Sequence, residues 1–147
     1  MLNEVFDPSR IKLDLESTTK IDVLGELIET IALPDTEFNR QELLDAVVLR
    51  ESKMSTNVMR GVAVPHGYCS AIRGVIGAIG VSRAGIKYDS FDREPVHIFF
   101  MLLMDESSQE EHLYVLNRLL EMLNSTVFSD IWRAQTPQEV YDMLCSY

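Results

Sequence analysis

Two segments near the start of the chain carry apolar residues at the three- and four-residue intervals of an amphipathic helix. The first segment follows a polar cluster at 17–19, and the second follows Asn39. Their apolar positions are Ile21, Leu24, Leu27, Ile28 and Ile31 in the first, and Leu43, Leu44, Val47 and Val48 in the second. The pattern predicts that two helices open the domain.

Three short apolar segments follow at 62–64, 74–82 and 95–104, and each is bounded by Gly, Pro or Asp. Their length and their β-branched residues predict strands. In the last segment both alternating faces are apolar, with Val96, Ile98, Phe100 and Leu102 on one and Phe99, Met101 and Leu103 on the other. Such a strand needs cover on both faces of its sheet.

Two further helices are predicted after 107–108 and at 136–139. Glu110 and Glu111 stand at capping-box distance from the serines, and Thr136-Pro137 combines an N-cap with a first-turn proline. The expected inner positions are Leu113, Leu116, Leu120 and Leu123 in the first helix, and Val140, Met143 and Leu144 in the second. Helices before, between and after strands predict an α/β fold, with a single-layer mixed β-sheet flanked by helices on both faces, as a single domain over 1–147.

Composition restricts the function classes. The chain has 147 residues and a net charge of −10, which repels phosphate backbones and anionic lipids and favours a basic protein surface as partner. We therefore expect no nucleic acid and no membrane insertion, since the longest apolar run, 98–104, is far below the roughly 20 residues of a spanning helix. The acidic N-terminus does not resemble a signal peptide, and the two distant cysteines suit a reducing compartment, so we expect a cytoplasmic protein.

The stretch GVAVPHG at 61–67 predicts a strand that ends on Pro65 and presents His66. A lone histidine of this kind can be a hydrogen-bonded core residue, a metal ligand, a general base or a nucleophile. The other histidines, His97 and His112, form no HxxxH or HExxH pattern with it, which argues against a metal site. We interpret His97, within the doubly apolar strand, as structural, and the proximity of Cys69 to His66 as coincidence.

Several blocks of the chain together are similar to one family, the enzyme IIA domain of the fructose/mannitol class of the bacterial phosphotransferase system, which includes the nitrogen-regulatory type. The blocks also occur in the family's order and at its separations. They are LRES at 49–52, STNVMRGVAVPHG at 55–67, AGIKYDSFDREPVHIFFMLL at 84–103, EEHLYVLNRLLEML at 110–123 and RAQTPQEVYDML at 133–144.

The resemblance implies that His66 accepts a phosphoryl group, supported by His112 and Arg50, without a cofactor. The chemistry suits these residues, because a neutral imidazole is a nucleophile and the charge on a transferring phosphoryl group calls for fixed donors. The alternatives are that His112 caps its helix or packs at the core edge, and that Arg50-Glu51 is an ordinary solvated pair.

One departure from the family lies at 55–61, where a glycine-rich loop is usual. Here the loop reads STNVMRG, so we expect a different loop shape, and Arg60 adds a positive charge that we expect beside the site. The resemblance implies that the chain takes phosphate from the histidine-containing phosphocarrier protein and donates it to an enzyme IIB. With no permease or IIB module visible, the alternatives are a free-standing nitrogen-type regulator of other proteins, or a relative that has lost transfer.

Overall fold

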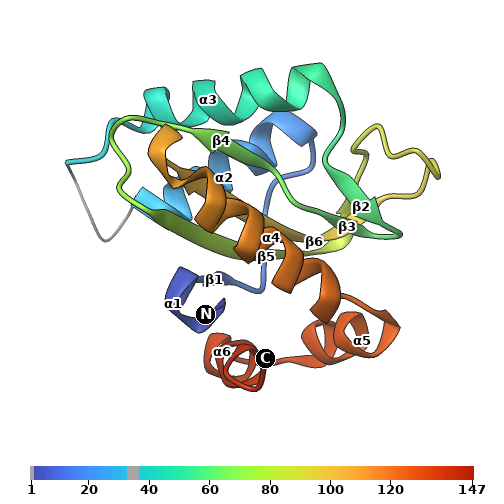
Figure 1. Cartoon of the computed structure of the whole chain (residues 1–147). Coiled ribbons are helices and arrows are strands. Elements are labelled where there is room, and N and C mark those ends of the chain that lie inside the picture. Colours follow the sequence, from blue (N-terminus) through green and yellow to red (C-terminus); the bar gives the residue numbers. More distant parts are fainter. Residues whose placement is uncertain (1, 33–36) are drawn as a thin grey trace.

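A single six-stranded mixed sheet forms the centre of the fold in the computed structural model, which describes residues 2–32 and 37–147 (Figure 1). The main strand order is β1-β5-β6-β3-β2, and β4 also pairs with β6. β6 runs antiparallel to β5 and parallel to β3 and β4. The strands are β1 Phe6–Lys12, β2 Asn57–Met59, β3 Val62–Ala63, β4 His66–Tyr68, β5 Val75–Ile86 and β6 Val96–Met104.

Helices cover both faces of the sheet, as the sequence predicts (Figure 1). One face packs on α2 and α3, and the other on α1, α4, α5 and α6. β6 divides the two cores, since Phe100 and Leu102 enter one and Phe99 and Met101 enter the other. The helices are α1 Leu2–Val5, α2 Lys20–Ala32, α3 Arg40–Lys53, α4 Gln109–Met122, α5 Ser125–Arg133 and α6 Pro137–Leu144, with a 3-10 turn at Glu106–Ser108. The predicted fold class is therefore confirmed.

Two of the predicted capping residues act as caps, but the predicted capping box at the start of α4 is wrong, because Ser108 makes no side-chain capping hydrogen bond. The Asn39 side chain accepts a hydrogen bond from the Glu42 amide at the start of α3, and Thr136 accepts one from the Glu139 amide at the start of α6. The predicted order is wrong at the N-terminus, where α1 and β1 precede α2. β1 reads FDPSRIK and buries only Phe6 and Ile11, because it is an edge strand whose proline interrupts the alternating pattern.

The predicted apolar face of α4 is wrong in part: Leu116 and Leu123 pack against the core as predicted, but Leu113 and Leu120 do not. Leu113 and Leu120 are 57% and 42% exposed, whereas the buried residues are His112, Val115, Leu119 and Met122. Both sets have the same three- and four-residue spacing, so periodicity alone could not choose between them. Because α4 turns its other face to the sheet, it buries His112 beside the candidate site.

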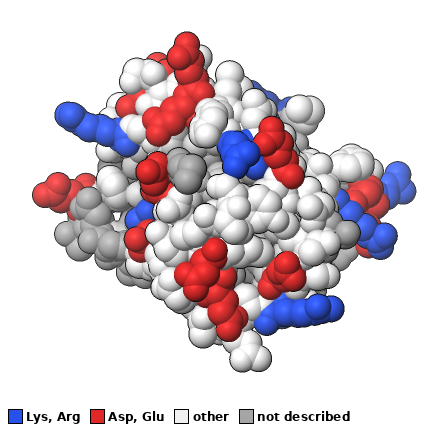
Figure 2. Space-filling view, turned by 60° about the horizontal axis from the view of Figure 1, so that its bottom comes forward, with Lys and Arg blue, Asp and Glu red and all other residues white. Residues whose placement is uncertain are grey.

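Charge is dispersed over the face drawn in Figure 2, where red carboxylates and blue basic groups lie scattered among uncharged side chains. The described residues on that face form no continuous basic patch of the kind that binds nucleic acid. Among the described residues, none of the helices combines the length and apolar character that crossing a bilayer requires.

Candidate active site

His66 is the first residue of β4 and lies on a strand end that is held firmly in place. β4 runs parallel to β6, with His66 opposite Leu102. The Leu102 amide donates a 2.9 Å hydrogen bond to the carbonyl of Pro65, directly before the histidine. The His66 ring itself is half-buried, so it is supported by the fold and still reachable from solvent.

A backbone carbonyl fixes the tautomer of His66. Its Nδ1 lies 2.9 Å from the carbonyl oxygen of Val64. Since a carbonyl oxygen can only accept, Nδ1 carries the proton and donates it, and Nε2 keeps its lone pair. Burial lowers the pKa of His66, and the positive charge of Arg50 lowers it further, against the Val64 hydrogen bond and Glu51, which raise it. The ring is therefore neutral near pH 7, with Nε2 as the available nucleophile.

His112 lies beside this ring, in the first turn of α4. The two ring centroids are 5.2 Å apart, and the ring planes are tilted by 43°. His112 is 95% buried, since only 5% of its surface is exposed, and its Nε2 has no hydrogen-bond partner among the described residues. Burial first, and the neighbouring His66 second, lower the pKa of His112 to about 4. The site thus pairs two neutral imidazoles, one with an unsatisfied buried nitrogen.

Arg50 reaches the site from the last turn of α3. One of its guanidinium nitrogens donates a 2.8 Å hydrogen bond to the carbonyl of Met54, which curls the side chain over the end of its own helix. No hydrogen bond joins Arg50 to either histidine in the described part of the chain. The guanidinium has five donors, and its positive charge lowers the pKa of His66, so Arg50 contributes a cation to the surroundings of this ring.

The neighbouring Glu51 is buried rather than solvated, which excludes a simple surface pair for this residue. Its carboxylate accepts hydrogen bonds of 3.0 and 2.6 Å from the amide and hydroxyl of Thr56, and Lys20 forms a 3.1 Å ion pair with it. These contacts tie the loop before β3 to α2 and α3. Sequence reasoning missed this role because no spacing pattern links Lys20, Glu51 and Thr56.

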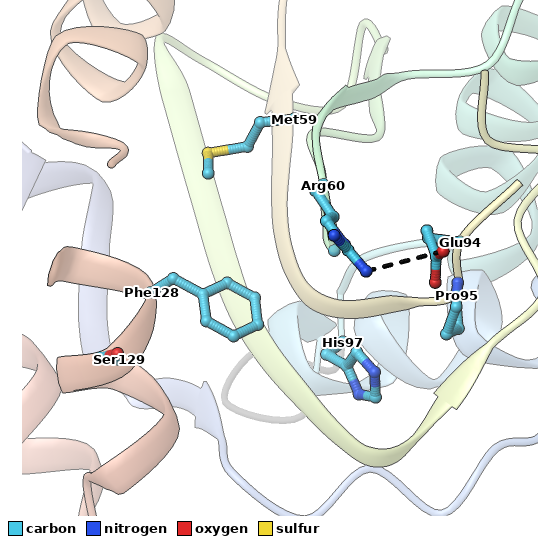
Figure 3. A pocket seen from close by; sticks show the side chains of 8 residues that line it. Met59, Arg60, Glu94, Pro95, His97, Phe128 and Ser129 are labelled. Atoms are coloured by element: carbon cyan, nitrogen blue, oxygen red, sulfur yellow. Dashed lines mark ion pairs between the residues drawn. The ribbon is translucent and has the colours of Figure 1, made fainter. Parts of the chain in front are cut away.

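In the loop at 55–61, residues 55–60 have no left-handed backbone conformation. Within this loop only Gly61 has a positive φ, of 77°, and the side-chain Nδ2 of Asn57 donates to the carbonyls of Met59 and Val62. Arg60, expected beside the site, instead forms a 3.6 Å ion pair with Glu94. The pair borders a cavity of about 430 Å³ near the start of β6, which contains none of the three candidate site residues (Figure 3).

His97 borders the same cavity, so this side chain is more accessible than its position within a doubly apolar strand led us to expect (Figure 3). Its Nδ1 nevertheless donates a 2.9 Å hydrogen bond to the carbonyl of Ser82, and its ring packs edge-on against Trp132. These contacts agree with a structural role. No group of three or more His, Cys, Asp or Glu side chains among the described residues is arranged to hold a metal ion.

Gly67 allows α3 to approach β4 closely, and we expect Gly67→Ala to disturb the site. A Cβ at this position would lie 2.8 Å from the carbonyl carbon of Ala46 and 2.9 Å from the amide nitrogen of Val47, both in the α3 backbone. Because a helix backbone cannot move aside as a side chain can, we expect a loss of about 1–3 kcal/mol in the free energy of unfolding, measured with urea.

Gly25→Ala is the matched control for this prediction. A Cβ on Gly25, inside α2, would meet nothing within 4 Å, so alanine should stabilise the helix by about 0.5–1 kcal/mol. Equal changes in the two variants would show that the close approach at Gly67 is unimportant.

The lowered pKa values predict an acid-dependent loss of stability. The unfolded chain has ordinary histidines with a pKa of about 6.5, so it takes up protons before the folded protein does. The stability contributed by neutral His112 is therefore fully present above pH 6.5 and declines as the pH falls towards its folded pKa of about 4. An NMR titration of the ring protons should show His112 titrating near 4 and His66 below 6.5, and an ordinary titration of His112 near 6.5 would refute this account.

Comparison with known proteins gives consistent matches over nearly the whole chain. A family model described as "Phosphoenolpyruvate-dependent sugar phosphotransferase system, EIIA 2" matches residues 4–147. A nitrogen regulatory protein of Pseudomonas aeruginosa is 30% identical over 144 residues, which cover 97% of this chain and 94% of that protein. A fructose-specific EIIABC component of Bacillus subtilis is 28% identical over 144 residues, but this chain spans only 23% of its length.

Solved structures show the same arrangement of elements. The nitrogen regulatory protein IIA-Ntr from Neisseria meningitidis superposes with a TM-score of 0.90 at 26% identity, over 97% of this chain and 98% of that one. The mannitol IIA structure from Escherichia coli gives a TM-score of 0.73 at 19% identity, over 94% and 97% of the two chains, and supports the fold alone.

Proposed function

The chain belongs to the EIIA 2 family of the phosphoenolpyruvate-dependent sugar phosphotransferase system, and from this premise we propose that it is a phosphoryl carrier that acts through His66. The observation that carries the proposal is the His66 ring, which is neutral, half-buried and held by Val64 so that Nε2 keeps its lone pair. The expected donor is the histidine-containing phosphocarrier protein, and the expected acceptor is an enzyme IIB or a regulatory target, all in the cytoplasm.

The transfer step needs no cofactor and no added base. The Nε2 lone pair attacks the phosphorus of a donor phosphohistidine whose ring is protonated. As the new N–P bond forms, the donor's N–P bond breaks, and its electron pair stays on the donor ring, which leaves as a neutral imidazole. His66 then carries the phosphoryl group on Nε2 and keeps its proton on Nδ1, where the Val64 carbonyl stabilises the resulting ring cation.

Catalysis in this scheme comes from positioning and charge. The three outer oxygens of the transferring group carry negative charge, which fixed donors stabilise better than mobile water does. In this proposal the donors are His112, near the start of α4, and Arg50, near the end of α3. Exposed apolar side chains near them, Tyr68, Leu113 and Met54, suit docking of a partner protein.

Phosphorylation by purified components tests the proposal. Wild-type protein incubated with phosphoenolpyruvate, enzyme I and the phosphocarrier protein should gain one acid-labile phosphoryl group per chain. The same sample without the phosphocarrier is the control and should gain none. If cognate donors leave the wild-type protein unlabelled, the chain is a relative that has kept the fold and lost transfer.

The nitrogen-type regulatory role is a second candidate, favoured by the nitrogen regulatory protein of Pseudomonas aeruginosa, which is 30% identical to this chain and is matched over 94% of its own length. In that role the phosphorylation state of His66 controls binding to other proteins. Passage of phosphate from the labelled chain to a sugar-specific enzyme IIB supports the sugar role. Retention of the phosphate, together with a partner bound in only one phosphorylation state, supports regulation.

A further inference from the structure

Tyr68 contacts the second histidine of the site through its hydroxyl group. The hydroxyl oxygen lies 3.4 Å from Nδ1 of His112, and the two rings meet edge to face, with centroids 6.0 Å apart and planes at 88°. Tyr68 follows His66 by two residues on β4, so strand alternation sends both side chains to the same face of the sheet. His66 and Tyr68 therefore both contact His112 from the same strand, β4.

The backbone of Tyr68 is fixed by the sheet, which restricts where its hydroxyl can lie. Tyr68 is opposite Met104 in the parallel pairing of β4 and β6, and the next amide, of Cys69, donates a 2.8 Å hydrogen bond to the Met104 carbonyl. The ring is 40% exposed, but its hydroxyl end meets a residue that is 5% exposed. The hydroxyl is therefore held within hydrogen-bond distance of the buried His112 imidazole.

The hydrogen bond at Nδ1 decides what the other nitrogen of His112 can do. A neutral imidazole has one N–H donor and one bare acceptor, and a partner at one nitrogen sets the role of the other. If the tyrosine donates, Nδ1 accepts and the proton is on Nε2. That nitrogen is buried, has no partner among the described residues and belongs to the ring beside His66. An N–H there can donate to an anion on His66, whereas a bare nitrogen there would repel it.

We propose that Tyr68 is a positioning residue: its hydroxyl donates to Nδ1 of His112, keeps the proton on Nε2, and so presents an N–H to the phosphoryl group on His66. The part of this assignment that concerns the phosphoryl group rests on the proposed function, in which His66 is the phosphoryl carrier. The tyrosine hydroxyl acts only through His112 and keeps its proton throughout the transfer.

Tyr68→Phe tests the proposal because it removes the hydroxyl and keeps the ring. The matched control is Tyr114→Phe, which removes a hydroxyl from an exposed tyrosine on the same helix as His112. With ¹⁵N-labelled histidine at pH 7.5, unphosphorylated wild-type protein and the control should show His112 protonated on Nε2 and bare on Nδ1. Tyr68→Phe should show both tautomers of His112, with His66 unchanged.

The rate of phosphorylation provides a second measurement. We expect Tyr68→Phe to take phosphate from the phosphocarrier protein about 2- to 10-fold more slowly than wild type, the effect of one lost hydrogen bond, while the control is unchanged. Wild-type protein with His112 protonated on Nδ1, or a Tyr68→Phe variant with unaltered tautomers, would overturn the proposal. Wild-type protein that shows the expected tautomers but takes no phosphate would overturn the proposed function. The role of the His112 N–H towards a phosphoryl group would fall with it, but the hydrogen bond from Tyr68 to Nδ1 of His112 would stand.

Discussion

His66→Ala is expected to take no phosphate from the phosphocarrier protein, under conditions in which the wild-type chain is fully labelled. The variant lacks the Nε2 lone pair, which the Val64 hydrogen bond leaves free for attack. The neighbouring His112 is not expected to replace it, because it is only 5% exposed and a donor protein could not reach it. Mass spectrometry of the intact protein, with and without acid treatment, measures the label.

His97→Gln is the matched control for this experiment. It removes another histidine, whose Nδ1 bonds to the Ser82 carbonyl and which borders the cavity at the start of β6. We expect this variant to be labelled like the wild type. Acid-labile phosphate on His66→Ala, or its loss from His97→Gln with the fold intact, would contradict the assignment of the acceptor.

His112→Ala is expected to slow phosphorylation of His66 by about 100-fold, the typical cost of one preorganised donor to a developing anion. The buried Nε2 of His112 has no other partner in the described part of the chain, and its ring lies 5.2 Å from that of His66. The final extent of labelling should still reach that of the wild type, because the nucleophile is intact. Initial rates at a fixed concentration of phosphorylated donor measure the effect.

His112→Gln separates the donor role from packing. A glutamine amide can still donate a hydrogen bond, so this variant should recover part of the rate that alanine loses. Thermal unfolding of both variants shows whether the helix remains packed. A rate for His112→Ala within about twofold of the wild type would show that this histidine only packs at the core edge, since the loss of a single neutral hydrogen bond should slow the reaction by about 2- to 10-fold.

The fold could be predicted well wherever the chain shows strong periodicity. α2, α3, α6 and β6 each carry an uninterrupted apolar pattern and clear boundary residues, and their positions follow from these. β1 was not predicted because its proline and its few buried residues hide an edge strand. On α4 two sets of positions have equal spacing, and only packing against the sheet shows that the set with His112 is buried.

The candidate site was predicted only in part, because its residues were found by resemblance and by local chemistry. The sequence predicted a strand that ends on Pro65 just before His66, whereas β3 ends at Ala63 and His66 begins the next strand, β4. The proximity of His66 to His112 depends on which face of α4 meets the sheet. Tyr68 and Glu51 carry no motif, and their roles arise from contacts between segments that are far apart in sequence.

NMR of the phosphorylated protein with ¹⁵N-labelled histidine tests the central claim most directly, since coupling to ³¹P identifies the nitrogen that bears the phosphoryl group. We expect a single phosphorylated histidine, His66, with phosphorus bonded to Nε2 and the proton retained on Nδ1 towards the Val64 carbonyl. Phosphorus on Nδ1 of His66, or on either of the other histidines, would contradict this claim.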